Sequence, residues 1–217
     1  MKERGIIFNS EMVRAILDGR KTQTRRVMKS QPEPSKTKDG DYWFPCNKTQ
    51  SMVHVSDFIP GNSKVVDMHE FYSVCCPFGG IGDRLWVRET FQAGLCTEST
   101  FAYKATHKPS DLEEGWDEII KWRPSIHMPR FASRITLEIT DVRVERLNNI
   151  SPRDVVSEGL IQLPASGRYV RFEGAQYFGL AYRDHKEAFA DLWDEVSKPD
   201  WSFESNPWVW VIEFKRV

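Results

Sequence analysis

Residues 19–26 read GRKTQTRR, which places four cations, two hydroxyl groups and one amide together with no apolar residue among them. Like charges repel one another, so a fold that holds such a cluster together usually sets an anion against it. The stretch therefore predicts an anion-binding turn in which Arg20, Lys21, Arg25 and Arg26 supply the charge. The alternative interpretation is a solvated cationic turn that binds nothing.

An amphipathic run leads the chain into this turn. Apolar residues recur at helical spacing across residues 9–18, which predicts a helix. Ser10 can cap its start, and Gly19 can end it in a left-handed conformation. Strands are expected at residues 6–8 and 25–28, so the basic turn joins a helix to a strand.

The rest of the chain carries further strand patterns and two more helices. Strands are predicted at residues 82–89, 101–104, 134–147 and 208–215. The longest changes phase near residues 140–141, which predicts a β-bulge, and the last is apolar on both faces, which predicts a central strand. A serine cap followed by proline predicts a short helix at residues 151–159, and a second amphipathic pattern predicts a helix at residues 182–196.

Three stretches lack a regular pattern. Residues 29–78 are interpreted as an insertion with a hairpin arm near residues 53–58, and residues 160–179 as a loop. The prolines within residues 123–130 exclude regular structure there. Short strands, a bulge and a few helices together predict an α+β fold, in which a small mixed β-barrel carries helices on its outside.

Composition sets limits on function. The chain has 217 residues, of which 40% are hydrophobic and 28% charged, and a net charge of −1, so it is not a polycation as a whole. Charge is nevertheless unevenly distributed. Residues 1–30 hold eight Lys or Arg against three acids, and residues 184–204 hold seven acids against two bases. No apolar run has the length of a signal peptide or membrane span, which predicts a cytoplasmic protein with no membrane partner.

The four cysteines could be thiols or metal ligands in such a compartment. Cys46, Cys75 and Cys76, with His54 or His69, form the one set that could hold zinc. Their spacing contains no C-x-x-C pair, and adjacent cysteines fit a tetrahedral site poorly. We therefore expect buried thiols and no metal.

A loop near residue 125 offers candidate contacts for a nucleic acid. Trp122 lies next to Arg123 and could stack on a base. His127 lies between two prolines, close to Arg130, and could stack on a base or contact a phosphate. The alternatives are a tryptophan in the core and a loop histidine bonded to the backbone.

Several of these stretches resemble the motifs of ASCH domains, which are PUA-like β-barrels associated with RNA. Residues 19–26 resemble the G-x-K-T-x-T-x-R signature, and residues 82–87, GDRLWV, resemble the G-D-x-L-x-V strand. Residues 151–159 are similar to the family's short helix ending in glutamate, and residues 209–214 to its closing strand. The chain looks like the larger, phage- or prophage-associated type, as a single domain with insertions at about residues 29–78, 92–132 and 160–205.

The resemblance implies a chemistry. Small bacterial members hydrolyse N4-acetylcytidine to cytidine and acetate, and the matching positions make Lys21 the proton acceptor, Thr24 the nucleophile and Glu158 the proton donor. A lysine accepts a proton only when neutral, and neighbouring arginines favour that form by lowering its pKa from about 10.4. The negative end of the preceding helix favours a protonated carboxyl group at Glu158. Lys21 and Thr24 can converge only if residues 20–23 form a turn, because a regular strand would place them on opposite faces.

We therefore expect an amidohydrolase acting on an acylated cytidine, without a cofactor. Other members of the family are RNA-binding modules or ribonucleases, so two alternatives remain at this point: a non-catalytic RNA-binding protein of phage origin, and a ribonuclease using the same basic cleft. The expected partner in each case is RNA or a modified nucleoside.

Overall fold

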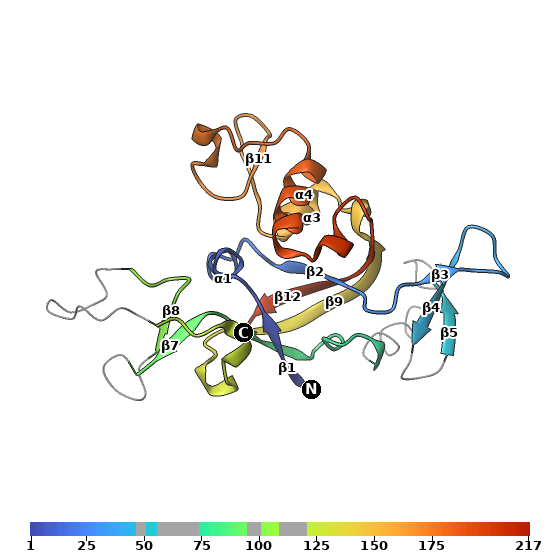
Figure 1. Cartoon of the computed structure of the whole chain (residues 1–217), viewed down its shortest axis with the longest axis horizontal. Helices are drawn as coiled ribbons and strands as arrows, with labels where there is room; N and C mark the ends of the chain where they lie inside the picture. The colour runs from blue at the N-terminus through green and yellow to red at the C-terminus, as the bar shows by residue number, and fades with distance from the viewer. Residues whose placement is uncertain (47–50, 56–73, 95–100, 109–120) are drawn as a thin grey trace, which may run out of the picture.

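The computed structural model describes residues 1–46, 51–55, 74–94, 101–108 and 121–217. Its central feature is a five-stranded mixed sheet in the order β1-β6-β9-β12-β2 (Figure 1). Its strands are β1 (Glu3–Ile7), β6 (Arg84–Arg88), β9 (Thr136–Arg146), β12 (Trp208–Arg216) and β2 (Gln23–Val27). β1 and β6 are parallel, and the other neighbours are antiparallel. Each of these strands was predicted, and the bounds differ by at most three residues.

The closing strand β12 is central, as its sequence predicts. It lies between β9 and β2, and its first five residues are all buried. The predicted bulge is also present on β9. Glu213 pairs with Asp141 and Phe214 with Ile139, so Thr140 has no partner on β12. Such an extra residue increases the local bend and twist of a sheet.

The sheet has a hydrophobic core on each face. Trp208, Trp210 and Ile212 of β12 belong to one core, which residues of α1 (Ser10–Leu17) also enter. Val209 and Val211 belong to the other, beneath α3 (Pro152–Ser157) and α4 (His185–Val196). Because side chains of a strand alternate between faces, this central strand must be apolar throughout. The helices thus lie on the sheet from two sides, and the fold is α+β (Figure 1).

The two edges of the sheet approach each other without pairing. Arg26 of β2 donates from Nη2 to the carbonyl of Ile7 in β1 at 2.6 Å, and its guanidinium lies 5.0 Å from the ring centre of Phe8. Among the described strands, β1 and β2 share no backbone ladder. The predicted barrel is therefore, in the described part of the chain, an open sheet with a side chain linking its edges.

The capping residues agree with the sequence at α3 and differ at α1. Ser151 and Asp154 form a complete capping box at the start of α3. The N-cap of α1 is Asn9, whose side chain accepts from the Met12 amide, so the predicted cap at Ser10 is wrong. Asn and Ser are about equally good caps, and the sequence offered both. Gly19 has φ +75° and ends α1 as predicted.

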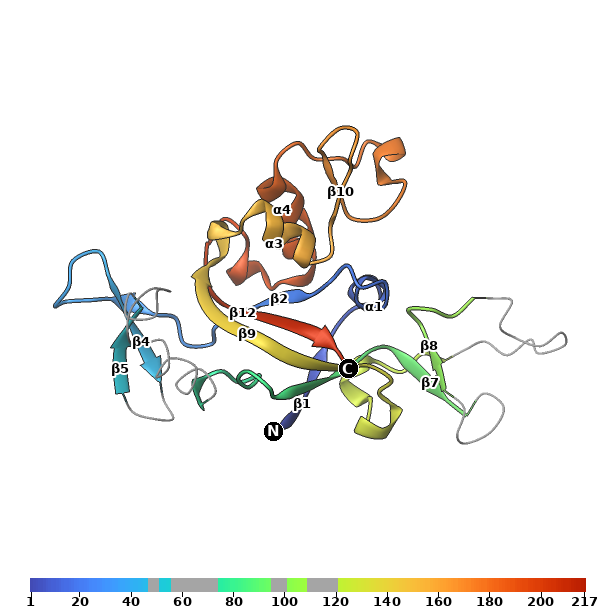
Figure 2. The same ribbon diagram turned by 180° about the vertical axis from the view of Figure 1, so that it is seen from behind.

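The insertions extend the fold outward. A three-stranded sheet consists of β3 (Glu33–Pro34), β4 (Tyr42–Cys46) and β5 (Ser51–His54), and β7 (Phe91–Ala93) pairs with β8 (Phe101–Tyr103). Figures 1 and 2 show these two units at opposite ends of the molecule. Part of the predicted arm, residues 56–58, lies outside the described residues.

The stretch predicted as a loop at residues 160–179 is more ordered than that. It holds the short antiparallel pair β10 (Ile161–Gln162) and β11 (Tyr169–Val170) and a 3₁₀ helix, Ala175–Phe178. Two-residue strands are too short to produce a periodic pattern, so the sequence did not show them. None of the helices in the described ranges is long and apolar enough to span a membrane.

Gly159, which follows α3, allows a first prediction. Its φ is +108°, and a Cβ there would lie 3.1 Å from Ala15 Cβ and 3.3 Å from Lys21 Cβ. We expect Gly159→Ala to lower the free energy of unfolding by roughly 3 kcal/mol, from backbone strain and overpacking. Urea unfolding gives this value directly.

Gly167→Ala is the matched control for that experiment. Gly167 also has a positive φ, +68°, but nothing lies within 4 Å of an added Cβ. It should lose about 1 kcal/mol. Equal losses in the two variants would contradict the close approach of Gly159 to Lys21.

Candidate active site

Two cations converge on the carboxylate of Glu158 at the end of α3. Lys21 Nζ donates to Glu158 Oε2 at 2.8 Å and to the Glu158 backbone carbonyl at 2.8 Å. Arg25 Nη1 donates to Glu158 Oε1 at 3.3 Å. The side chains are buried, at 0% exposure for Lys21 and 4% for Glu158. Two residues predicted as catalytic, 137 positions apart in sequence, are thus in direct contact.

Backbone hydrogen bonds hold Lys21 in this place. The amides of Arg20 and Lys21 both donate to the carbonyl of Ala15 in α1, each at 2.9 Å. The amide of Thr22 donates to the carbonyl of Ser157 in α3, also at 2.9 Å. The basic stretch is therefore fixed between the ends of two helices before β2 begins.

The electrostatics of Lys21 combine opposing effects. Burial lowers its pKa, because the ammonium loses water. Glu158 acts against this through its charge and its hydrogen bond, while the charges of Arg26 and Arg25 lower the pKa further. The sequence predicted the contribution of the arginines, but burial is the larger cause. Burial also lowers the pKa of Arg26 to about 10, against the attraction of Glu158.

A second set of charges surrounds Arg25 on the α3–α4 face of the sheet. Arg25 of β2 and Arg143 of β9 both stand opposite Val211 of β12, so they form one row across three strands. Two carboxylates bridge them. Glu145 accepts from Arg143 Nε at 2.6 Å and from Arg25 Nη2 at 3.1 Å. Asp154 accepts from Arg143 at 2.9 Å and lies 3.3 Å from Arg25 Nη2.

This bridging group was not predicted. Charged residues that alternate along a strand, such as Asp141, Arg143 and Glu145, are typical of a solvated face. The signal that could have identified them is the acid in the first turn of α3, Asp154. Part of the negative charge that balances the basic stretch therefore comes from carboxylates of the protein itself. The sequence had predicted that a bound anion would supply it.

Thr24 lies apart from the Lys21–Glu158 contact. It pairs with Ile212 of β12 and is 2% exposed, and its hydroxyl makes no hydrogen bond to a described residue. Successive strand residues point to opposite faces, so Thr24 and Arg25 project to different sides of β2. Lys21 and Thr24 were expected to converge through a turn at residues 20–23, but the turn falls at residues 18–19. The structure thus unites Lys21 with Glu158, and Thr24 makes no hydrogen bond to either side chain.

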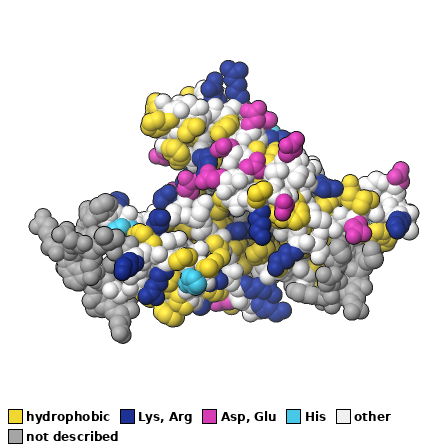
Figure 3. All heavy atoms as spheres, viewed as in Figure 1, with side chains coloured by type: hydrophobic (Ala, Val, Ile, Leu, Met, Phe, Trp, Pro, Cys, Tyr) yellow, Lys and Arg dark blue, Asp and Glu magenta, His cyan; other side chains and the backbone are white. Residues whose placement is uncertain are grey.

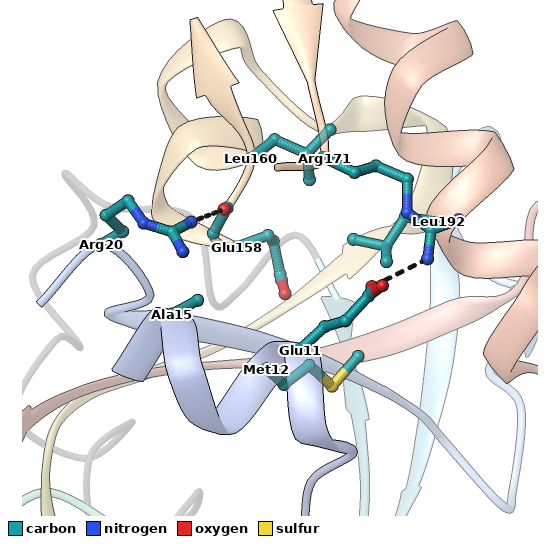
Figure 4. Close-up of a pocket in the computed structure, with 9 residues that line it drawn as sticks. Glu11, Met12, Ala15, Arg20, Glu158, Leu160, Arg171 and Leu192 are labelled. Atoms are coloured by element: carbon teal, nitrogen blue, oxygen red, sulfur yellow. Dashed lines mark hydrogen bonds and ion pairs between the residues drawn. The ribbon is translucent and has the colours of Figure 1, made fainter. Parts of the chain in front are cut away.

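A narrow pocket reaches Glu158 from outside. Figure 4 shows the Glu158 side chain pointing into it, with Arg20 on one side and the Glu11–Arg171 ion pair on the other. Its volume is about 30 Å³, enough for one or two water molecules. A wider hollow of about 550 Å³ shares Glu11, Arg20 and Arg171 as lining residues and adds Arg14. The two spaces therefore adjoin, with the wide one outside.

The other predicted binding residues divide into two groups. Arg20 belongs to the pocket, where it donates to the Gly159 carbonyl at 2.6 Å and pairs with Asp18. Arg130 instead pairs with Glu3, at the first residue of β1, whereas Arg26 contacts Ile7 at its last. Four residues of strand separate these points by roughly 13 Å.

The remaining loop residues lie with Arg130. Arg123 forms an isolated β-bridge with Phe91, the first residue of β7. The rings of Trp122 and His107 pack edge-on, with their centres 5.6 Å apart. His127 is exposed in a 3₁₀ helix, Ser125–His127, and a second 3₁₀ helix, Arg130–Ala132, begins at the end of the segment predicted as irregular. Arg20 and Arg130, which were predicted to bind one nucleotide together, thus contact different elements, the end of α3 and the start of β1.

The residues considered as candidate zinc ligands, from which no metal site was expected, form no metal-binding group in the described part of the chain. No group of three or more His, Cys, Asp or Glu residues there has the arrangement of a metal site. Cys76 is buried, and Cys75 is disulfide-bonded, so the expectation of thiols is wrong at Cys75. The candidate ligand His69 lies outside the described residues.

Comparison of the chain with protein-family models, with curated proteins and with solved structures finds no match. The chemistry of this site therefore follows from its own residues and their geometry.

Removing one member of the buried pair should be costly. Glu158→Leu leaves Lys21 and Arg25 without their shared carboxylate, and we expect it to lower the free energy of unfolding by about 3–5 kcal/mol. Adding Lys21→Met should restore part of this loss, because the unpaired ammonium is gone. Asp18→Asn, which breaks the exposed pair with Arg20, should change stability by less than about 1 kcal/mol. Additive losses in the double variant would contradict the pairing.

Acid should weaken the bridge between the arginines. Burial opposes ionisation of Asp154, but hydrogen bonds from Ser151 and the charges of Arg25 and Arg143 lower its pKa below the ordinary 3.8. Its contribution to stability is therefore complete above about pH 4 and is lost as pH falls through the lowered pKa. We expect Asp154→Asn to flatten the acid limb of the stability curve, measured by urea unfolding from pH 7 to pH 2. The exposed Asp39→Asn should leave that limb unchanged.

Proposed function

We propose that this protein is an ASCH-type amidohydrolase that cleaves an acylated cytidine, such as N4-acetylcytidine, at its exocyclic C–N bond. One observation carries the proposal: Lys21 Nζ and Glu158 Oε2 meet at 2.8 Å inside the protein, at the two positions that the family motifs assign to base and acid. The approach of β1 to β2 through Arg26 supports the proposal that the sheet is a PUA-like barrel left open at one seam.

The buried pair explains how a lysine becomes a base. The ammonium of Lys21 and the carboxylate of Glu158 are in hydrogen-bond contact and shielded from water. Such a pair can exchange one proton, giving an amine and a carboxylic acid. The net charge is zero in both forms, and burial lowers the pKa of Lys21, which favours its release of the proton. In the uncharged form Lys21 can accept a proton and Glu158 can donate one, which are the two roles that amide hydrolysis requires.

The proposed reaction has two stages. Thr24 Oγ1 attacks the acyl carbon while Lys21 takes its proton, and Glu158 protonates N4 as the C–N bond breaks, which releases cytidine. Water then cleaves the acyl ester on Thr24, releasing acetate and restoring the proton balance. Thr24 must turn toward the pair for the first stage.

The substrate must also enter. Pockets that bind small ligands usually have volumes of several hundred cubic ångströms. The outer hollow, at about 550 Å³, therefore fits a nucleoside. The inner pocket, at about 30 Å³, does not. Arg20 forms part of the wall between them, and its side chain is 32% exposed. We propose that the acyl group enters when Arg20 leaves the Gly159 carbonyl.

The test measures the release of cytidine from N4-acetylcytidine, with chromatography as the assay. Thr24→Ala should abolish turnover, a loss of at least about 1,000-fold, and Thr24→Ser should retain a measurable rate because it keeps the hydroxyl group. Thr22→Ala is the matched control, since Thr22 is exposed in the same stretch and should keep full activity. No turnover by folded wild-type protein, or equal rates for Thr24→Ala and wild type, would refute the proposal.

A further inference from the structure

A groove lies on the α4 side of β2, away from the pocket at Glu158. It has a volume of about 400 Å³. Its walls are the edge strand β2, the last turn of α4 and the segment that follows, which ends in a 3₁₀ helix, Pro199–Trp201. The lining residues are Arg25, Arg26, Val27, Lys29, Trp193, Val196, Ser197, Lys198 and Trp201.

The groove combines positive charge with aromatic surface. Four of its lining residues are cationic, two are tryptophans and none is acidic. Among the described residues, Lys29 and Lys198 have no carboxylate partner, and both are exposed. This contrasts with α4 itself, where acidic side chains gather on the surface (Figure 3).

The acids of α4 nearest to the groove are engaged elsewhere. Asp194 accepts from the amide of Phe203 at 2.7 Å, and Glu195 pairs with Arg171 on the side of the outer hollow. The charge inside the groove is therefore not balanced by the helix that forms its wall. An anion placed there would meet Lys29 and Lys198, which have no carboxylate partner among the described residues, whereas Arg25 is already paired with Glu145, Asp154 and Glu158.

A buried donor provides a second, independent observation. The Nε group of Arg25, on the α4 face of the sheet, is buried and has no hydrogen-bond partner among the described residues, and Arg25 lines the groove. The Arg25 side chain is 0% exposed. A buried guanidinium N–H without a partner is unfavourable, and a ligand oxygen in the groove would relieve it.

We propose that this groove is a second binding site, for one nucleotide with its phosphate. The ring stacks on Trp201, which is partly exposed, and the phosphate faces Lys29 and Lys198. Aromatic stacking and lysine contacts are the two interactions by which proteins hold single-stranded nucleic acids without reading their sequence. The inference goes beyond the proposed hydrolysis and stands even if the protein hydrolyses nothing.

The test is binding of a labelled single-stranded RNA of about eight nucleotides, measured by fluorescence anisotropy with the whole chain. Lys29→Glu with Lys198→Glu should weaken binding by about tenfold or more and reduce its salt dependence. The matched control is Lys104→Glu with Lys186→Glu, which changes the net charge by the same amount. Both residues are exposed, and neither lines the groove. That control should weaken binding by less than about threefold.

Two further measurements complete the test. Trp201→Leu should weaken RNA binding by about fivefold or more while leaving the affinity for poly-glutamate unchanged. Competition by cytidine 5′-monophosphate as strong as that by the RNA assigns the groove to free nucleotides, and weaker competition assigns it to a strand. The proposal would be overturned if the two double lysine-to-glutamate variants weakened RNA binding equally. It would also be overturned if the protein bound poly-glutamate as tightly as RNA, or did not bind RNA.

Discussion

The buried contact between Lys21 and Glu158 is the interaction on which the rest of the site depends. A lysine and a glutamate without water lose several kcal/mol each in hydration, so they stay buried only with excellent geometry. That geometry comes from backbone contacts that anchor the basic stretch to α1 and α3, and from the absence of a side chain at Gly159. Arg25 then links this contact to the arginine row on β9 and β2. The end of α3, the basic stretch and the arginine row on the sheet are therefore joined by ion pairs into one electrostatic unit.

This unit changes the meaning of the basic stretch. The four cations do not form one patch that awaits a ligand. Lys21 and Arg25 point inward to Glu158, and Arg26 links the two edges of the sheet. Arg20 donates to the Gly159 carbonyl at the narrow pocket. In the groove beside α4, Lys29 and Lys198 come from segments far apart in the chain and have no carboxylate partner among the described residues. Arg25 belongs to both places, because it contacts Glu158 and also lines the groove.

Much of the fold could be predicted because its signals are local. The alternation of β9, the phase change at Thr140, the capping box of α3 and the two-sided apolar β12 each depend on a few neighbouring residues. The contact of Lys21 with Glu158 came only from the resemblance, since nothing local pairs residues so distant. The bridge of Glu145 and Asp154 was missed because side chains two strands apart meet only in the folded sheet. That Arg130 pairs with Glu3 of β1 was missed for the same reason.

The proposed hydrolysis requires Lys21 to release its proton more readily than an ordinary lysine, because burial lowers its pKa. The most direct measurement is NMR titration of the side-chain nitrogen of Lys21 in protein with isotopically labelled lysine, assigned with the Lys21→Met variant. This account predicts that Lys21 loses its proton at a lower pH than the exposed lysines of the same protein, such as Lys104 and Lys186. A Lys21 that stays an ammonium until the exposed lysines titrate would contradict it.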